Sequence, residues 1–282
     1  MGDVVELDVD GRQRRFLLRL PGVTDRPVPL VLVLHGRTLD GQSMREWTTF
    51  DEQADAWGVA VAYPDGYAKT WADGRGVTKA DDAGVDDVAF LRAVIDWTAE
   101  HHGTTPDRTV VAGISNGAFM AHRLAAQASD RVAVLAAVAG GLPAYLLDRQ
   151  PTHAVSAMLI HGTADSAAPI NGGYSRHRGP NGEQRGRTLS LTESAEYWRA
   201  VDRCPPGPGE THTTALSSRV TVRGGVGGTE VVAWTVFGGG HTWPGGPDSS
   251  QWGEHTTREF DAAEEICRFA VPLLGSADRR LL

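Results

Sequence analysis

The amino-acid sequence predicts an α/β fold in which a mostly parallel central sheet carries helices on both faces. Runs of strand length that are rich in valine, isoleucine and leucine alternate along the chain with amphipathic helical patterns. Most of these runs are apolar throughout, as in parallel strands that are buried on both faces. Strand, helix and strand in that order imply right-handed crossovers. Because neither a repeat nor a Pro/Ser/Gly-rich linker interrupts the order, residues 1–282 are predicted to form one domain.

The strands are predicted from apolar runs and from the turns that bound them. Two extended runs within residues 4–22 are separated by Asp10-Gly11, so they should form an antiparallel hairpin at one edge of the sheet. The buried strands are expected within residues 29–36, 58–66, 109–115, 132–141, 157–165 and 230–241.

The helices are predicted from helical periodicity and from capping signals. The spacing of Ser43 and Glu46 is that of a capping box and predicts one helix through residue 57. A cap at Asp86 or Asp87 should start a second helix that ends at Gly103. Further helices are expected directly after Ser115 and within residues 191–203 and 257–275.

Two long segments, residues 166–187 and 205–219, fit no regular element. Loops of that length in a compact domain are usually functional or mobile, so both are expected to roof a cleft.

Composition excludes several classes of partner. The net charge is −8, and acidic and basic residues are interspersed, so neither nucleic acid nor an anionic membrane is an expected partner. No stretch approaches the roughly 18 apolar residues that cross a bilayer. The opening residues lack the pattern of a signal peptide, which predicts a soluble, cytoplasmic protein; a secreted protein trimmed of its leader would look the same. Oligomeric state stays open.

The two cysteines do not indicate a metal site or a disulfide scaffold. Cys204 and Cys267 have no neighbouring metal-ligand spacing, and two cysteines are too few for a disulfide framework. They are expected to be reduced thiols, with a single bridge between them left open.

One serine stands where a strand pattern gives way to a helical pattern. Gly113-Ile114-Ser115-Asn116-Gly117 follows the strand run and precedes an amphipathic segment, which is the context of a nucleophile elbow. The glycines would let strand and helix backbones approach closely. An ordinary turn serine is the alternative. A hydroxyl needs a base and an oriented acid to act as a nucleophile, so Ser115 requires partners elsewhere in the chain.

The partners are expected later in the chain, the acid before the histidine, each after a strand. Asp165 follows one buried strand run, and His241 follows another after three glycines. His255 is the rival histidine, but no buried strand precedes it. Ser115, Asp165 and His241 are therefore the predicted catalytic residues.

The oxyanion of an acyl-transfer intermediate needs two N–H donors. The backbone N–H of Asn116 should supply one, because it is the first residue of a helix. The other is expected in the loop after residue 36, from Arg37, with Thr38 as the alternative donor and as a substrate-binding candidate. The Arg37 side chain could guide a substrate carboxylate, although a solvated side chain is the simpler interpretation.

The chain resembles the polyhydroxybutyrate depolymerase and feruloyl esterase group of α/β-hydrolases. The motifs are LVLHG, YPDG, DDVAFL, GISNGAFMAHRLA, HGTAD, NGG and GGGHTWPGG, which span nearly the whole length. The resemblance implies an α/β-hydrolase fold, the triad named above, ester hydrolysis without metal or organic cofactor, and Trp243 in the substrate cleft. Trp71 and Trp252 are further candidates for aromatic walls. Arg37 departs from the cysteine or glycine often found at its position, and Ala168 departs from the usual valine.

The predicted function is a serine carboxylic-ester hydrolase that acts through an acyl-enzyme on hydroxycinnamoyl or other small aryl or short-acyl esters. A polyester depolymerase and an acetyl (xylan) esterase are the alternatives among hydrolases. An acyltransferase and a non-catalytic binding protein on a hydrolase scaffold also remain open, since fold alone does not define function. A cluster of basic residues is interpreted as a solvated loop, or else as a feature that favours carboxylate-bearing or decorated polysaccharide substrates: Arg176, His177, Arg178, Arg185 and Arg187.

Overall fold

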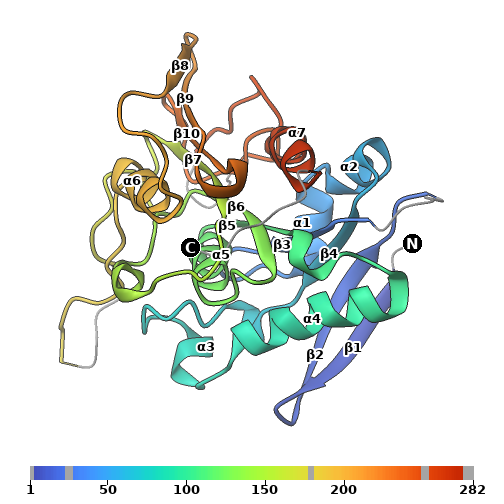
Figure 1. The fold of residues 1–282 in the computed structure, drawn as a ribbon. Coiled ribbons are helices and arrows are strands. Elements are labelled where there is room, and N and C mark those ends of the chain that lie inside the picture. The colour runs from blue at the N-terminus through green and yellow to red at the C-terminus, as the bar shows by residue number, and fades with distance from the viewer. Residues whose placement is uncertain (1–2, 23–27, 177–180, 249–253, 276–282) are drawn as a thin grey trace.

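A ten-stranded sheet organises the described part of the chain (Figure 1). The computed structural model describes residues 3–22, 28–176, 181–248 and 254–275. The strands are β1 (Asp3–Val9), β2 (Arg12–Arg19), β3 (Leu30–Leu34), β4 (Ala60–Pro64), β5 (Thr109–Ile114), β6 (Val132–Val138), β7 (Ser156–Gly162), β8 (Glu210–Thr213), β9 (Ser217–Arg223) and β10 (Glu230–Val236). Their order in the sheet is β1-β2-β4-β3-β5-β6-β7-β10-β9-β8.

The centre of the sheet is parallel and its two ends are antiparallel. Strands β4, β3, β5, β6, β7 and β10 pair in parallel, as predicted for strands separated by helices. The β1–β2 hairpin at one end is also as predicted. At the other end β8, β9 and β10 form an antiparallel meander, which the sequence did not predict. Residues 205–219 therefore belong largely to this edge and do not roof the cleft.

Helices cover both faces of the sheet. They are α1 (Gly41–Trp47), α2 (Phe50–Trp57), α3 (Lys79–Asp82), α4 (Asp87–His102), α5 (Asn116–Gln127), α6 (Leu191–Val201) and α7 (Ala262–Leu274). Short 3₁₀ segments are η1 (Tyr67–Lys69), η2 (Pro106–Arg108), η3 (Ala144–Asp148) and η4 (Val226–Gly228). Helices α4, α5 and α6 share one hydrophobic core, and α1, α2 and α7 share the other.

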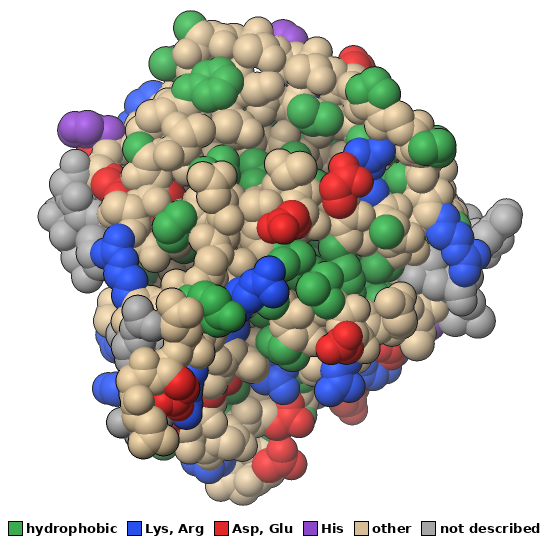
Figure 2. Space-filling model, turned by 90° about the vertical axis from the view of Figure 1, so that its left-hand side faces the viewer, with side chains coloured by type: hydrophobic (Ala, Val, Ile, Leu, Met, Phe, Trp, Pro, Cys, Tyr) green, Lys and Arg blue, Asp and Glu red, His purple; other side chains and the backbone are tan. Residues whose placement is uncertain are grey.

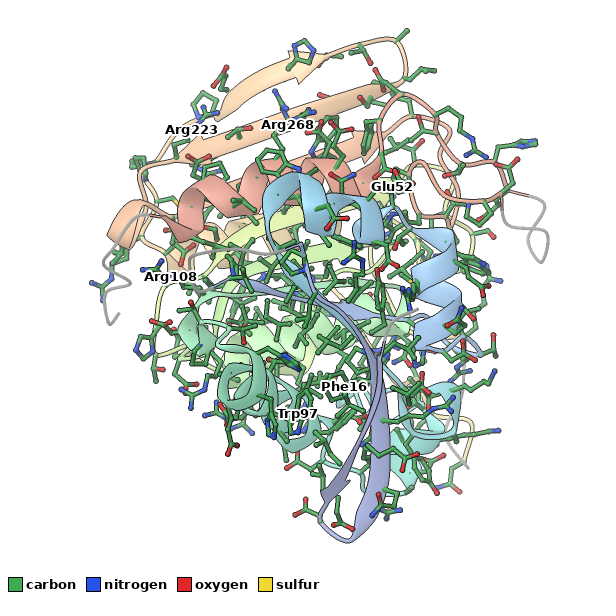
Figure 3. The ribbon with its side chains drawn as sticks, turned by 90° about the vertical axis from the view of Figure 1, so that its right-hand side faces the viewer. Phe16, Glu52, Trp97, Arg108, Arg223 and Arg268 are labelled. Atoms are coloured by element: carbon green, nitrogen blue, oxygen red, sulfur yellow. The ribbon has the colours of Figure 1, made fainter. Side chains whose placement is uncertain are left out.

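Strand β3 shows how the sequence builds both cores. Side chains alternate along a strand, so the leucines of LVLVL enter the α4–α5–α6 core and its valines enter the other. The edge hairpin joins the first core through Phe16, whose ring meets that of Trp97 on α4 edge-on at 5.5 Å (Figure 3). Burial on both faces explains the continuous apolar runs of the central strands.

The predicted helix through residues 43–57 is wrong in its continuity and in its cap. Asp40 caps α1 by accepting from the Ser43 N–H, and Ser43 lies inside the helix. The helix ends at Thr48, whose hydroxyl donates to the Met44 carbonyl. Thr49 then donates to Asp261, the cap of α7, and α2 starts anew. A contact across 212 residues decides this break, so no local pattern indicates it.

The remaining helices agree more closely with the sequence. Asp86 caps α4, and Gly103 ends it in the left-handed conformation. Helix α7 begins at Ala262, five residues later than the predicted start, because Asp261 caps it. Cys204 and Cys267 are free thiols, and burial raises the pKa of each to about 11 and about 12.

Charges of both signs lie on the surface. Figure 2 shows Lys and Arg side chains interspersed with Asp and Glu on one face, and neither sign dominates it. Among the helices in the described ranges, none is long and apolar enough to pass through a lipid bilayer.

A buried histidine on α5 should make stability depend on pH. His122 is fully buried, and its Nδ1 accepts from Trp198 Nε1 of α6 at 3.1 Å. Burial lowers the pKa of His122 from 6.5 to about 3, so between these values the unfolded chain binds a proton that the folded chain does not. We expect this term to reduce the free energy of unfolding by about 1 kcal/mol per pH unit as pH falls from about 6.5 to about 3.

Urea unfolding from pH 7 to pH 4 measures this effect. His122→Gln retains an acceptor for Trp198 and does not titrate, so it should show the shallower pH dependence. His101→Gln, at an exposed position, is the control. Equal slopes for wild type and His122→Gln would contradict the assignment.

Candidate active site

The segment around Ser115 forms a sharp turn between β5 and α5. Ser115 has φ 56° and ψ −117°, a conformation that costs a non-glycine residue about 1–3 kcal/mol. A Cβ on Gly113 would lie 2.4 Å from the Gly117 carbonyl oxygen. A Cβ on Gly117 would lie 2.2 Å from the Leu34 carbonyl oxygen. Both glycines are therefore needed for the close approach that holds Ser115 at the carboxyl edge of the sheet.

Asp165 and His241 come together after β7 and β10. His241 Nδ1 lies 2.8 Å from Asp165 Oδ2. A carboxylate only accepts, so Nδ1 carries the proton and Nε2 of the neutral ring is left as an acceptor. His255, the rival histidine, has a 90% exposed side chain and lies beside Asp248 instead. The structure therefore pairs the predicted acid with the predicted histidine.

The Asp165 carboxylate is held from both sides. Its Oδ1 accepts from the N–H groups of Ala167 and Ala168 at 2.9 and 2.8 Å. Its Oδ2 faces His241 and also His161, whose Nε2 is 3.3 Å away and donates to the Ala168 carbonyl. Burial raises the pKa of this carboxyl, but hydrogen bonds from His161 and His241 outweigh it and lower the pKa to about 2. Asp165 is therefore ionised at neutral pH and holds the imidazole in one tautomer.

Ser115 and His241 line the same cavity, of about 550 Å³. Its described walls include the loop after β3, the start of α5, residues 167–176 and the loop after β10, and Arg75 and Val77 also line it. The first of the two long segments thus lines the cleft as expected. His177 and Arg178 of the basic cluster, and Trp252, lie outside the described residues.

The candidate oxyanion donors differ in their surroundings. Asn116 begins α5. Its side-chain Oδ1 accepts from the Trp71 N–H at 2.7 Å, and its Nδ2 donates to Asp73 Oδ2 at 2.7 Å. Thr38 lines the cavity, but its N–H donates to the Lys69 carbonyl at 2.9 Å. Arg37 remains the candidate for the second donor. Its guanidinium is not fully solvated, because Nη2 donates to a backbone carbonyl at 2.6 Å.

The two aromatic candidates that can be placed behave differently. Trp243 lines the cavity, and its ring packs 6.0 Å from that of Phe50. Trp71 does not line it: the side chain is fully buried, its ring lies tilted against that of His35, and its Nε1 donates to the His35 carbonyl at 2.9 Å. The prediction of Trp71 as a cleft wall is corrected, because this loop turns its indole into the core to support the strand end.

The sequence did not single out Glu254. Its carboxylate accepts from the His241 N–H and from the Ser166 N–H, the latter at 3.1 Å. Glu254 thereby links the loop after β7 to the loop after β10. These two loops carry Asp165 and His241, so the link helps to fix the position of one relative to the other. No motif surrounds this glutamate in the sequence, so only the folded loops reveal it.

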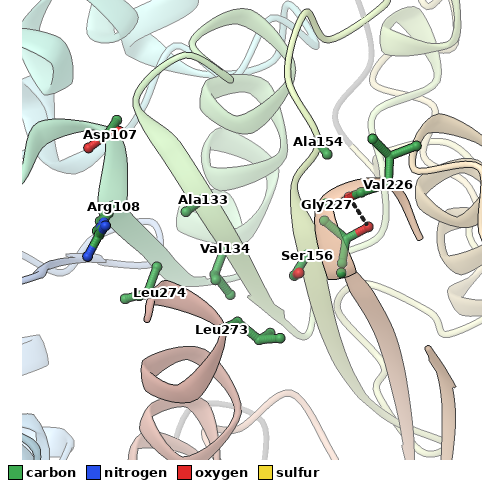
Figure 4. Close-up of a pocket in the computed structure, with 12 residues that line it drawn as sticks. Asp107, Arg108, Ala133, Val134, Ala154, Ser156, Val226, Gly227, Leu273 and Leu274 are labelled. Atoms are coloured by element: carbon green, nitrogen blue, oxygen red, sulfur yellow. Dashed lines mark hydrogen bonds between the residues drawn. The ribbon is translucent and has the colours of Figure 1, made fainter. Parts of the chain in front are cut away.

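A second cavity, of about 50 Å³, lies at the amino ends of the central strands (Figure 4). Asp107, Arg108, Ser156 and Leu274 are among its walls. The Ser156 hydroxyl already accepts from the Glu230 N–H at 3.2 Å. This cavity has no imidazole or thiol in its described lining, so the candidate chemistry lies at the opposite edge of the sheet.

The sequence is similar to those of known proteins. Residues 15–171 match the family model described as esterase PHB depolymerase. The protein named "Putative esterase NocK" of Nocardia uniformis subsp. tsuyamanensis is 35% identical over 257 residues, which cover 86% of this chain and 74% of that protein. The bifunctional acetylxylan esterase/xylanase XynS20E of Neocallimastix patriciarum is 26% identical over 49% of this chain and only 19% of its own length.

A solved structure extends the likeness to the fold. The acetyl xylan esterase from Aspergillus awamori superposes with a TM-score of 0.60 at 14% identity, covering 86% of this chain and 94% of that one. The strained turn at Ser115, the parallel sheet and the match over more than half of the sequence all support the same family and fold. The chain is a member of the PHB depolymerase family of esterases and has an α/β-hydrolase fold.

Proposed function

We propose that the protein is a serine carboxylic-ester hydrolase in which Ser115 is the nucleophile, His241 the general base and Asp165 the residue that orients it. The hydrogen bond between His241 and Asp165, beside the cavity that Ser115 lines, is the observation that carries this proposal. It leaves Nε2 of His241 as the acceptor that a serine hydroxyl needs.

The reaction proceeds in two acyl-transfer steps. Ser115 Oγ attacks the ester carbonyl while His241 Nε2 takes the hydroxyl proton. The oxyanion accepts from the backbone N–H groups of Asn116 and Arg37. Collapse expels the alcohol, which receives the proton from His241, and leaves the acyl group on Ser115. Water then attacks this ester with His241 as base, and the acid is released.

The size and lining of the cavity favour small aryl or short-acyl esters as substrates, including hydroxycinnamoyl esters. Its volume lies within the range of small-molecule sites, roughly 300–1,000 Å³. Leu39, Phe119 and Trp243 contribute apolar walls, and Thr38 contributes a polar one. An acetyl ester of xylan is the alternative favoured by the names of two similar proteins, and a hydroxyalkanoate polyester by the family description.

Two experiments test the proposal. A fluorophosphonate probe should label Ser115, because only an activated serine reacts; absence of labelling would favour a non-catalytic scaffold. A panel of methyl ferulate, 4-nitrophenyl acetate, acetylated xylan and hydroxybutyrate oligomers then compares the substrate classes by kcat/KM. Ester formation with an added alcohol in place of acid release would indicate an acyltransferase.

Glu254 should act as a positioning residue for His241. Glu254→Gln keeps the shape but leaves one oxygen for two N–H donors, and an unsatisfied N–H costs about 1–3 kcal/mol. We expect kcat to fall about tenfold with KM changed less than about twofold. The kcat is expressed per serine titrated with fluorophosphonate, so a loss of folded protein does not enter it. Glu259→Gln, on the exposed side of the same segment, is the control; an unchanged kcat per titrated serine in Glu254→Gln would contradict this role.

A further inference from the structure

Two of the arginines that line the cavity containing Ser115 come from neighbouring loops on the Asn116 side. Arg37 follows β3, and Arg75 lies between η1 and α3, so the fold brings them together from separate loops. The Arg75 side chain is 10% exposed. Burying an arginine costs free energy unless its charge is paired, so the groups around Arg75 indicate the role of its charge.

Several contacts hold the Arg75 side chain in the wall of this cavity. Its Nη2 donates to Asp73 Oδ2 at 2.8 Å, and its N–H donates to Oδ1 of the same carboxylate at 3.0 Å. Its guanidinium carbon lies 3.6 Å from the centre of the Phe119 ring, and the Phe119 N–H bonds to the Ser115 carbonyl one helical turn away. Arg75 therefore packs on a residue of the first turn of α5, and it lines the same cavity as Ser115.

The carboxylate that neutralises Arg75 is shared. Asp73 is fully buried, and its Oδ2 also accepts from the Asn116 Nδ2 at 2.7 Å. Arg37 donates from Nη2 to the Val77 carbonyl, an uncharged acceptor. Burial lowers the pKa of Arg37, the charge of Arg75 lowers it further, and Asp73 opposes both. Asp73 is thus bonded to Arg75, and its charge also acts on Arg37.

The other charged side chains of the described lining do not neutralise the positive charge of Arg37 and Arg75. Its other charged side chains are Arg176, which donates to the Ser166 carbonyl, and Asp248. Asp248 is half-exposed and lies 3.5 Å from His255 and 3.8 Å from Arg258. The described walls of the cavity therefore carry a surplus of positive charge, concentrated at Arg37 and Arg75.

We propose that Arg37 and Arg75 form a subsite for a carboxylate of the substrate, so that the natural ester carries a free acid group a few bonds from the scissile carbonyl. This inference rests on the proposed esterase function. Guanidinium groups held by packing and by a buried aspartate are pre-organised to receive a carboxylate. Hydrogen bonds between charged groups in a partly buried site favour the anionic ester over its neutral counterpart by about tenfold or more.

Matched ester pairs test the subsite. The first pair is mono-4-nitrophenyl adipate and its methyl ester, with the charge on the acyl side. The second pair is 4-acetoxybenzoate and its methyl ester, with the charge on the alcohol side. Each kcat/KM is divided by the rate of alkaline hydrolysis of the same ester, and the ratio of anionic to neutral ester is the readout. We expect a ratio of at least about ten in one pair for the wild type.

Variants assign the preference to the arginines. Arg75→Gln should lower the ratio about tenfold, and Arg75→Lys should retain more of it. Arg268→Gln, on α7 and outside the described cavity lining, removes the same charge and should keep the wild-type ratio (Figure 3). Both esters are measured on one sample, so a loss of folded protein cancels in the ratio.

The outcomes separate the two proposals. Efficient hydrolysis of the neutral esters with a wild-type ratio near one in both pairs overturns the subsite and leaves the esterase intact. An equal ratio in wild type and Arg75→Gln also overturns the subsite. No hydrolysis of any ester together with no fluorophosphonate labelling overturns the proposed function itself.

Discussion

Replacing Ser115 with alanine should reduce kcat/KM for 4-nitrophenyl butyrate by at least about 10³-fold, because the variant has no nucleophile to form an acyl-enzyme. The fold should survive. Ser115 contributes no side-chain cap to α5, and alanine keeps the Cβ that the turn already accommodates at φ 56°. Measurement of initial rates beside circular dichroism and thermal unfolding checks both halves of this expectation.

The matched control for Ser115→Ala is Ser175→Ala, a second serine that lines the cavity. It tests whether the loss of a hydroxyl in this cavity suffices to lower the rate. Turnover by Ser115→Ala within about tenfold of wild type would refute the assignment of the nucleophile.

Asp165→Asn should lower kcat by roughly 10⁴-fold, which is the size of effect seen when an imidazole is held in the wrong tautomer. The two N–H donors of Ala167 and Ala168 would keep the carbonyl oxygen of the new amide on the Oδ1 side. Its NH₂ group would then face His241 Nδ1 and donate to it. The ring proton moves to Nε2, and His241 can no longer accept from Ser115.

The control for Asp165→Asn is Asp96→Asn, which removes a carboxylate from an exposed ion pair with Arg131. It should retain wild-type kcat. Active-site titration separates the tautomer effect from unfolding, because the fraction of intact enzyme is counted directly. A kcat for Asp165→Asn within about tenfold of wild type would rule out the orienting role.

Local patterns predicted most of the fold because each central strand is apolar on both faces and α4, α6 and α7 each begin with a capping side chain. The runs that became β3 to β7 and β10 were recognised in this way, as were α4 and the helix after Ser115. The β8–β9 hairpin was missed because β8 is exposed and polar, so its residues show no apolar alternation. The break at Thr48 was missed because Asp261 stabilises it from the other end of the chain.

The candidate site likewise contains residues that the sequence predicted and residues that it did not. Ser115, Asp165 and His241 could be predicted because each follows a strand, and the carboxyl ends of parallel strands meet at one edge. The supporting residues could not. Glu254 and Asp73 act through bonds to backbone or buried groups that come from other loops, and the polarity of a residue in sequence does not indicate its partner.

The sequence by itself determined the layered fold, the order of the three candidate catalytic residues and the glycines around Ser115, because these depend on periodicity, spacing and backbone conformation. Tertiary structure alone decided that Trp71 is buried, that Thr38 donates its N–H to Lys69, and that Arg37 and Arg75 line one cavity while Asp73 is bonded to Arg75. Loop packing sets these contacts, and it depends on segments far apart in the chain.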